Sequence, residues 1–424
     1  MINTIFINFR GGIISPGVLY NILLAVSKVK VRDVRFGLRQ RLLIDLEPYN
    51  LTELTEELDK LELAYEVDTC NHPNICSSYP AEDVFIRNTW LSEAIYKKVL
   101  DAIDSLPRLK INICDNNQSF APILTGNINW IASPSLENFW YLIIRFPKTN
   151  VIYEWNMLCN TDDIAAVTKT IEALILQHAE KFIDNETANG EELFALFTTK
   201  DFNVKPAESA VVLPQFNLPY YEGLNRYNDK YWLGIYRRDE LFRVQFLRKL
   251  CKLCINTGIT QICCTAWKSI LIKGIEEKDK EKWNLLLEEF QINMRHAANE
   301  LNFQVEDNCI EGLDLKTLLV KHLSIDDTRT FGICIGIKTR KKSEVFSSIL
   351  VRRRYVIDFL GIRLFKVYDI LCAKDFNPNE RTGEIYSKDN PKILLPEQLR
   401  RCVLKYYQYR AGITNPAPVI PKLN

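Results

Sequence analysis

The sequence predicts an α+β protein assembled from two similar halves, and two observations support this prediction. First, an apolar-periodic helix at residues 19–26 is followed by a β-rich stretch at residues 34–44, and the same order recurs about 228 residues later, at residues 246–255 and 259–272. Second, the two stretches align without a gap, so that helix, turn and strand coincide. A repeat at this spacing indicates one duplicated unit rather than two unrelated domains.

The signals that end each element agree with the repeat. Residues 256–258, Asn-Thr-Gly, stop the second helix. Each β-rich stretch is interrupted by polar residues at the same place, by residues 39–41 in the first half and residues 267–269 in the second. Later strands are expected within residues 140–146 and 331–337, so both halves mix helices with strands.

Composition and charge exclude several classes of protein. A chain of 424 residues is long enough for two or three domains, and 47% hydrophobic with 25% charged residues is typical of a globular protein. The net charge of +1 gives no overall field that would attract nucleic acid or an acidic membrane. No signal peptide and no membrane-spanning run is evident. We therefore expect a cytoplasmic protein without a nucleic-acid or membrane partner.

The repeat and the polar stretches suggest the domain boundaries. The polar segment before Ala210 is expected to be a linker, and the Pro-rich end from Ala411 an extended tail. The predicted order is a first half-domain (1–50), a first α/β lobe (51–185), the linker (186–210), a second half-domain (211–278), a second α/β lobe (279–375) and a C-terminal segment with the tail (376–424).

The cysteines favour buried thiols over disulfides. Twelve cysteines in 424 residues are too dilute for a disulfide scaffold, and most lie within apolar runs. Cys251 and Cys254 have the spacing of a zinc or redox pair. No second pair at zinc spacing accompanies them, so packing in the core is the favoured interpretation.

Three stretches of the first half resemble the haemoprotein of assimilatory sulfite reductase and its nitrite reductase relatives. The resemblance covers roughly residues 1–185, and the second copy extends the pattern to about residue 375. The matching stretches are Gly-Leu-Arg-Gln at 37–40, Thr-Cys-Asn-His-Pro-Asn at 69–74, and Leu-Pro-Arg-Leu-Lys at 106–110 followed by Gly-Asn-Ile-Asn-Trp at 126–130.

The resemblance implies a fold and a basic site. The fold would have two ferredoxin-like half-domains and two mixed α/β lobes, arranged with pseudo-twofold symmetry around a cleft. Arg39, Arg108 and Lys110 fall where the family places cations that neutralise sulfite or nitrite and the carboxylates of a sirohaem. Glu66 falls where the family has a further arginine, and a carboxylate there would repel a substrate anion.

The cysteine pattern departs from the family. These reductases hold a four-iron cluster with two cysteine pairs in the second copy, but residues 291–304 contain no cysteine. Cys309 and Cys334 occur singly further on. Cys70 and Cys76 are spaced as one such pair but lie in the other copy, where Cys114 offers a single further thiol. We therefore expect no iron–sulfur cluster and assign no metal ligands.

Two further positions are candidates for cofactor binding. Arg295 and His296 lie in a dense polar stretch on a predicted helix, where His296 would be a haem ligand, an acid–base group or simply a hydrogen-bonded histidine. Arg329 precedes an apolar strand and would point into the same cleft or lie at the strand edge. The basic runs at 340–342 and 352–354 suggest either a docking patch or, as favoured, solvated surface.

Three functions stay open at this level. The first is a nitrite/sulfite reductase-like protein that binds a small anion or sirohaem and receives electrons from a partner protein. An electron-transfer association fits the resemblance, because some relatives continue into a rubredoxin-type module. The second is a non-catalytic scaffold or accessory subunit with an empty inherited pocket, and the third is an anion-binding regulatory module.

Overall fold

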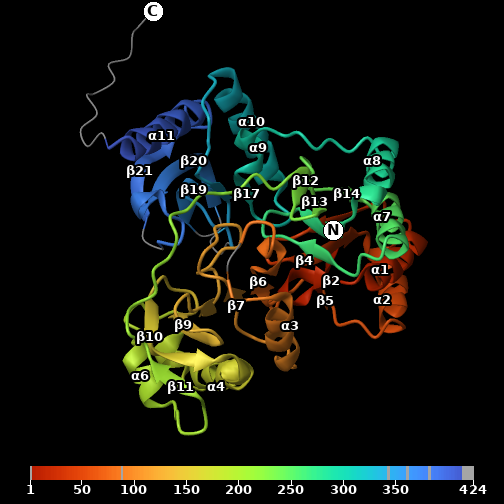
Figure 1. The fold of residues 1–424 in the computed structure, drawn as a ribbon. Coiled ribbons are helices and arrows are strands. Elements are labelled where there is room, and N and C mark those ends of the chain that lie inside the picture. Colours follow the sequence, from red (N-terminus) through yellow and green to blue (C-terminus); the bar gives the residue numbers. More distant parts are fainter. Residues whose placement is uncertain (1, 87–88, 341–343, 360–361, 381–382, 413–424) are drawn as a thin grey trace, which may run out of the picture. The chain divides into compact units, whose positions relative to one another are not determined.

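The computed structural model describes residues 2–86, 89–340, 344–359, 362–380 and 383–412, whose helices and strands are labelled in Figure 1. The chain forms two compact units. Unit 1 comprises Met1–Pro214 and Pro219–His296, and unit 2 comprises Gln215–Leu218 and Ala297–Asn424. The predicted tail lies, from residue 413 on, outside the described residues. Among the helices of the described part, none combines the length and the apolar character needed to cross a membrane.

Unit 1 contains both predicted half-domains, and their elements repeat in order. The first copy is built from β1 (Asn3–Asn8), β2 (Ile13–Ile14), α1 (Pro16–Lys28), β3 (Asp33–Phe36), β4 (Arg41–Leu46), α2 (Leu51–Asp59) and β5 (Glu66–Val67). The second is built from β12 (Gly223–Tyr227), β13 (Lys230–Ile235), β14 (Phe242–Arg243), α7 (Val244–Asn256), β15 (Ile262–Cys264), β16 (Ile270–Ile275) and α8 (Lys280–Glu289). The predicted duplication is confirmed, because α1 and α7 both begin and end 228 residues apart.

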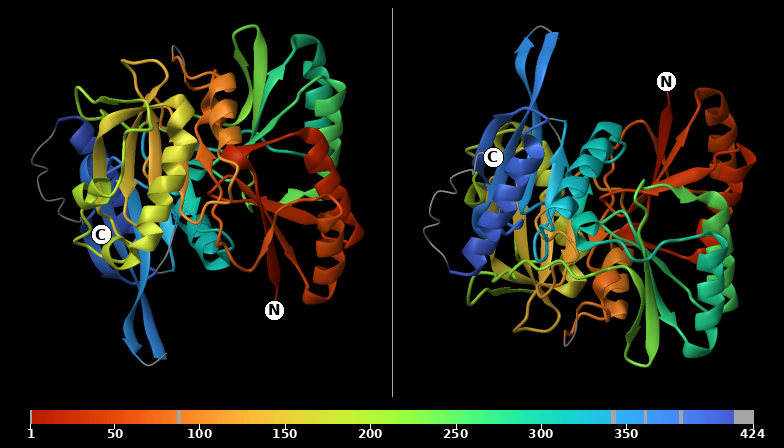
Figure 2. Two further views of the ribbon diagram at one scale, coloured as in Figure 1. Left: turned by 90° about the horizontal axis from the view of Figure 1, so that it is seen from below. Right: turned by 90° about the horizontal axis from the view of Figure 1, so that it is seen from above.

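The apolar spacing that predicts the two helices also forms their shared core. Buried residues recur at the i, i+3, i+4 and i+7 positions of both helices, which places them on one face. They are Leu19, Ile22, Leu23 and Val26 in α1 and Leu247, Leu250, Cys251 and Cys254 in α7. The two helices pack side by side within one hydrophobic cluster (Figure 2). Ser15 caps α1 by accepting the N–H of Val18 at 3.3 Å, and Pro16 occupies its first turn.

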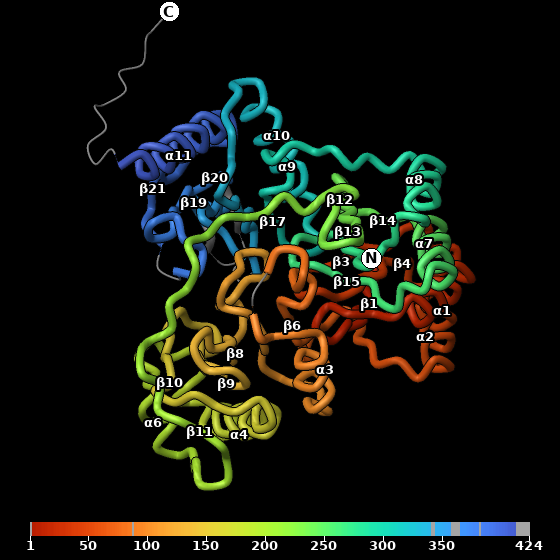
Figure 3. The backbone as a smooth tube through the Cα atoms, viewed as in Figure 1, coloured from red at the N-terminus to blue at the C-terminus, as the bar shows by residue number. Residues whose placement is uncertain are grey.

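The two half-domains also exchange strands, and β14, β3 and β15 of this arrangement are labelled in Figure 3. One sheet has the order β14-β3-β4-β1-β5 and the other the order β12-β13-β16-β15-β2. The short β14 of the second copy therefore pairs with β3 of the first, and β2 of the first pairs with β15 of the second. This reciprocal pairing makes the two copies one folded body.

The first α/β lobe completes unit 1. Its elements are β6 (Cys76–Ser77), α3 (Glu93–Ala102), β7 (Ile111–Cys114), β8 (Ile128–Ala132), β9 (Phe139–Arg145), β10 (Ile152–Asn160), α4 (Ile164–Gln177), α5 (Ala179–Phe182), α6 (Gly190–Ala195) and β11 (Val204–Pro206). The sheet order is β11-β10-β9-β8-β7-β6. The segment 186–210, expected to be a linker, thus contributes α6 and an edge strand to this lobe.

Unit 2 repeats the lobe in a smaller form. It contains α9 (Ala298–Leu301), β17 (Phe303–Val305), α10 (Ile310–Ile325), β18 (Ile335–Lys338), β19 (Ile349–Phe359), β20 (Ile362–Ala373), β21 (Gly383–Asn390) and α11 (Leu395–Arg410). Parallel pairs join β17 to β18 and β18 to β19, and the remaining pairs are antiparallel. The first lobe has the same change from parallel to antiparallel pairing after β8, so the duplication includes the lobes.

Candidate functional site

Arg39 lies in the turn between β3 and β4, and only 2% of its surface is exposed. Its Nε and Nη2 donate to the carbonyl oxygen of Asn74 at 3.1 and 2.7 Å. Nη2 also donates to the carbonyl oxygen of Ile111 at 3.0 Å and to Oδ1 of Asn112 at 3.2 Å. The guanidinium therefore ties the turn to the start of β7.

Asn74 completes this connection from the other side. Its Nδ2 donates to the carbonyl oxygens of Phe9, Arg39 and Gln40 at 2.7, 2.8 and 2.9 Å. Buried carbonyl groups need such partners, because leaving one without a hydrogen bond costs about 1–3 kcal/mol. Arg39 and Asn74 thus satisfy each other's backbone, and the resemblance at residues 37–40 and 69–74 corresponds to one polar core.

Arg108 and Lys110 lie at the entry to β7, where the backbone is firmly held. Oε1 of Glu172 accepts the N–H groups of Arg108 and Leu109, each at 2.6 Å. The N–H of Lys110 donates to Oδ1 of Asn127 at 3.1 Å. The side chain of Arg108 is exposed and that of Lys110 is half-buried. Since Arg39 binds the carbonyl of the residue that follows Lys110, the structure brings these predicted cations to one region.

Glu66 has a local role in the same half-domain. Its carboxylate accepts the N–H of Asn71 at 3.0 Å and that of His72 at 3.3 Å. Nδ1 of His72 lies 3.2 Å from Oε1 of Glu66. The carboxylate therefore orders the loop before Asn74.

His296 belongs to a buried carboxylate–histidine pair. Its Nδ1 lies 2.6 Å from Oε1 of Glu222, and its backbone N–H donates to Oε2 at 2.8 Å. The Glu222 side chain is fully buried and that of His296 is 6% exposed. The ring of Tyr236 contacts the imidazole edge-on at 5.1 Å between centroids. Because Nδ1 is held by a carboxylate, Nε2 is the ring nitrogen left to exchange a proton or bind a ligand.

The helix predicted around His296 is wrong. Residues 292–297 are not helical, and the short α9 begins only at Ala298. The side chain bonds across 74 residues to Glu222 instead of to its own turn, so a tertiary contact overrides the local pattern. Arg295 is exposed beside it.

The other polar residues of that stretch belong to unit 2 and hold a loop. Nδ2 of Asn299 donates to the carbonyl oxygen of Thr328 at 2.8 Å. Oγ1 of Thr330 donates to Oδ1 of Asn299 at 3.1 Å, and Asn302 donates to the carbonyl oxygen of Thr330. These contacts frame Arg329, whose Nη2 forms an exposed ion pair with Asp327 at 2.7 Å. Most polar residues of this stretch are therefore explained by their hydrogen bonds to residues 328–330.

The structure shows where the predicted cysteine pair and the basic runs lie. Cys251 and Cys254 are buried in α7, which confirms the core interpretation, and burial raises the pKa of Cys251 to about 12. Arg352 and Arg354 on β19 bind the buried carboxylate of Asp369, each at 2.9 Å. Of the other basic run, residues 341 and 342 lie outside the described part. Within the described ranges, no three His, Cys, Asp or Glu side chains are grouped to hold a metal ion.

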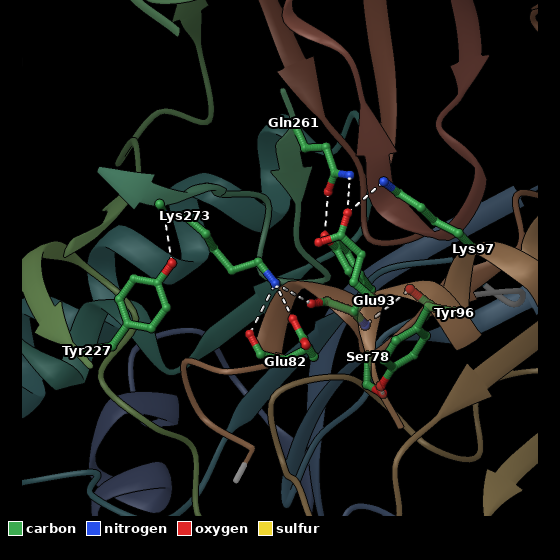
Figure 4. Close-up of polar contacts among 11 residues, drawn as sticks. Ser78, Glu82, Glu93, Tyr96, Lys97, Tyr227, Gln261 and Lys273 are labelled. Carbon is green, nitrogen blue, oxygen red and sulfur yellow. Dashed lines mark hydrogen bonds and ion pairs between the residues drawn. The ribbon is translucent and has the colours of Figure 1, made fainter. Parts of the chain in front are cut away.

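A polar cluster that the sequence analysis does not predict joins the second half-domain to the first lobe (Figure 4). Lys273 on β16 donates to Oε2 of Glu82 at 2.8 Å and to the carbonyl oxygens of Tyr79 and Glu82 at 3.3 and 3.1 Å. Its ammonium also lies 4.1 Å from the centroid of the Tyr79 ring. Burial raises the pKa of Glu82, although the Lys273 ammonium opposes this shift.

Side-chain contacts extend this cluster from Tyr79 to Lys97. The hydroxyl of Tyr79 donates to Oε1 of Gln261, whose Nε2 donates to Glu93 at 2.9 Å. Lys97 forms an ion pair with the same carboxylate at 2.6 Å. Since Lys273 and Glu82 are 191 residues apart, no local spacing could have identified them. With its ammonium bound by three oxygens, Lys273 acts as a clamp between the two parts.

Unit 1 also contains a half-open cavity of about 480 Å³. Its polar walls come from Asn8, Arg10, Glu66, His72, Asn74 and Ser105. Of the described residues that line it, none is one of the six predicted site residues. The cavity meets the predicted basic region at Asn74, whose carbonyl oxygen binds Arg39, and at Pro107, which directly precedes Arg108.

Comparison with known proteins gives a fold. The sequence matches no protein-family model and no curated protein. The structure is similar to that of the Mycobacterium tuberculosis NirA protein, with a TM-score of 0.72 and 13% sequence identity. The match covers 99% of this chain and 82% of that one. The chain therefore shares the fold of that structure, and its own fold is the duplicated α+β fold that the sequence predicts.

Proposed function

We propose that this chain is a nitrite/sulfite reductase-like, redox-associated protein that binds a small oxyanion, or the carboxylates of a sirohaem, at its basic residues. Electrons would arrive from a separate carrier protein. The observation that supports this proposal best is the connection of Arg39 to the backbone beside Lys110, within a reductase fold. A cation placed beside a rigidly held strand entry is suited to bind an anion without reorganisation.

The contacts of Arg39 do not fit those of an anion ligand. Its Nε and Nη2 are occupied by two backbone carbonyls and one amide oxygen. We therefore assign Arg39 a positioning role, in which it fixes the strand entry that carries Lys110. Arg108 fits the ligand role better, because its side chain is exposed while its backbone is fixed by Glu172.

Arg295 and His296 remain in the proposal as the contribution of the second half of unit 1, and Arg329 is proposed as a separate cation of unit 2. Arg295 and Arg329 are exposed cations. His296 has its Nδ1 held by Glu222, so that Nε2 would exchange a proton with a bound ligand. When bound, sirohaem would supply the iron chemistry, and these residues would hold its carboxylates or orient a proton.

The test is to produce the full chain with a supply of sirohaem and to measure visible absorption and iron content after purification. The proposal predicts a coloured protein that retains iron through gel filtration, and substitution of Lys110 and Arg108 by Gln should weaken this retention. Arg226→Gln is the matched control, because Arg226 is an exposed arginine of β12. A colourless, iron-free protein that also shows no response to sulfite or nitrite would overturn the proposal.

A non-catalytic scaffold is the second candidate, and one observation favours it. In the second copy, the hairpin turn that corresponds to the turn of Arg39 contains Lys268. Its ammonium forms a buried ion pair with Glu240 at 2.7 Å. Arg39 in the first turn and Lys268 in the second therefore both bind partners within the protein, which is a structural role. A scaffold predicts no colour and no shift of the melting temperature with sulfite or nitrite, whereas anion binding raises that temperature by mass action.

A further inference from the structure

Two cysteines of unit 2 lie against each other in its core. Cys372 is on β20 and Cys402 is on α11, and their Sγ atoms are 3.1 Å apart. Both thiols are buried, with Cys372 7% and Cys402 0% exposed. A disulfide has an S–S bond of about 2.05 Å, so the two sulfurs need to approach by about 1 Å to form one.

The surroundings make the two sulfurs chemically different. The hydrogen bond from the Cys402 thiol lowers the pKa of Cys372, and the ammonium of Lys405, one turn further along α11, acts in the same direction. The same hydrogen bond raises the pKa of Cys402, and burial adds to that effect. Burial instead raises the pKa of other core thiols, for example that of Cys334 to about 12. Because Cys372 is also the more exposed of the two, it is suited to attack as a thiolate, and the fully buried Cys402 to resolve the product.

We propose that Cys372 and Cys402 form an oxidation site, at which a hydroperoxide converts the two thiols into a disulfide that joins β20 to α11. This site is independent of the proposed anion-binding function. A small peroxide suits a pair of which only Cys372 is slightly exposed. The closeness of the second thiol favours the disulfide over further oxidation of the first.

The step balances in atoms and electrons. The Cys372 thiolate attacks one peroxide oxygen, the O–O bond breaks, a sulfenic acid forms, and the leaving hydroxide or alkoxide takes up a proton. The Cys402 sulfur then attacks the Cys372 sulfur, the S–S bond forms, the S–O bond breaks, and water leaves with the Cys402 proton. Two thiols lose two electrons in total, and the peroxide gains them.

The disulfide would close a loop that contains β21. In the reduced protein α11 is held to the sheet by apolar packing of residues such as Leu399 and Val403. A covalent bond at Cys402 would add a constraint that persists when this packing loosens. We expect the oxidised form to melt at a higher temperature and to protect α11 against proteolysis.

The experiment uses the full reduced chain with Cys70→Ser, because Cys70 is exposed and would react first. Native protein is treated with hydrogen peroxide, alkylated under denaturing conditions and analysed by peptide mass mapping. We expect a linked peptide pair containing residues 372 and 402, and two fewer alkylated thiols than in untreated protein. Cys251 and Cys254, which are buried three residues apart on α7, serve as the internal control and should remain alkylated.

Single variants separate the two roles. In Cys402→Ser, the sulfenic acid on Cys372 should persist and be captured by a dimedone-type reagent, while in Cys372→Ser the thiol at 402 should stay reduced. If a variant does not fold, the peptide map of the Cys70→Ser protein decides alone. The inference is overturned if that map shows no 372–402 link, or if the link forms only after unfolding.

Discussion

The two hairpin turns of unit 1 have the same backbone but different side-chain chemistry. In the first copy the N–H of Gly37 donates to the carbonyl of Arg41 at 2.9 Å, and in the second the N–H of Thr265 donates to that of Ser269 at 3.0 Å. The left-handed residue falls at the same place in both, with φ of 54° at Gln40 and 55° at Lys268.

The side chains of these two left-handed residues are both buried, but they find different polar partners. The amide of Gln40 bonds the backbone of Ser77 in both directions, at 2.9 and 2.8 Å, and Gly12 leaves room for it. In the second copy Lys268 instead pairs with Glu240, which follows Gly12 by 228 residues and also has positive φ. The backbone therefore fixes the geometry of both turns, whereas the buried polar side chain can have a neutral or a charged partner.

The largest effect is expected from removing one partner of the buried ion pair between Lys268 and Glu240. Lys268→Met would leave the buried Glu240 carboxylate without its main partner and should lower the free energy of unfolding by about 3–5 kcal/mol. The double variant Lys268→Met with Glu240→Met removes both charges and should recover most of that loss. Chemical denaturation of the three proteins measures this. If the single and the double variant lose the same free energy of unfolding, the loss does not come from an unpaired Glu240 carboxylate.

The next effect concerns Arg39 in the first turn. Arg39→Met removes the donors that satisfy two buried carbonyls and should cost about 2–4 kcal/mol of unfolding free energy. If the Arg39→Met variant no longer binds sulfite or nitrite, we expect the cause to be its lower stability. Arg226→Met is the exposed control in the same denaturation series. An Arg39 variant with normal stability but no anion response would make Arg39 a direct ligand.

The third effect is a difference in pH dependence between the copies. The first half-domain, residues 1–50, has no cysteine, whereas the second carries four. Burial raises the pKa of Cys263 to about 11, with Lys273 opposing the shift. Because this folded pKa lies above the unfolded value of about 8.5, the stabilising protonated thiol contributes fully below pH 8.5 and its contribution is lost as pH rises through 11.

Cys263→Ala tests this dependence. Stability should fall by about 3 kcal/mol per such thiol between pH 8.5 and 11, and the variant should show a shallower fall. Urea denaturation at several pH values measures the slope, and Cys334→Ala in unit 2 serves as a matched buried thiol. A slope that is unchanged in Cys263→Ala would show that another group causes the alkaline loss.

The smallest effect is expected at Trp267, which occupies in the second turn the position of Arg39 in the first. Its indole Nε1 donates to the carbonyl of Phe120 at 2.7 Å. Trp267→Phe loses this one bond and should cost about 1–2 kcal/mol, less than the Arg39 substitution. Thermal unfolding followed by tryptophan fluorescence and circular dichroism compares the two. A larger loss for Trp267→Phe than for Arg39→Met would reverse the ranking of the two turns.

The sequence predicts what is local or repeated. Helices α1 and α7 and both hairpins follow from apolar spacing and from the 228-residue repeat. It does not predict contacts between distant residues. Glu222 is 74 residues from His296 and Lys273 is 191 residues from Glu82, so neither pair leaves a periodic signal. The helix expected at His296 is wrong for the same reason.

We propose that this chain carries a basic site beside the backbone that Arg39 fixes. The most direct measurement is the absorption spectrum of the full chain loaded with sirohaem, recorded while sulfite or nitrite is added. We predict a bound chromophore whose spectrum shifts with the anion, and a weaker shift in Arg108→Gln than in Arg226→Gln. A chain that never takes up the chromophore and never responds to either anion would contradict the claim.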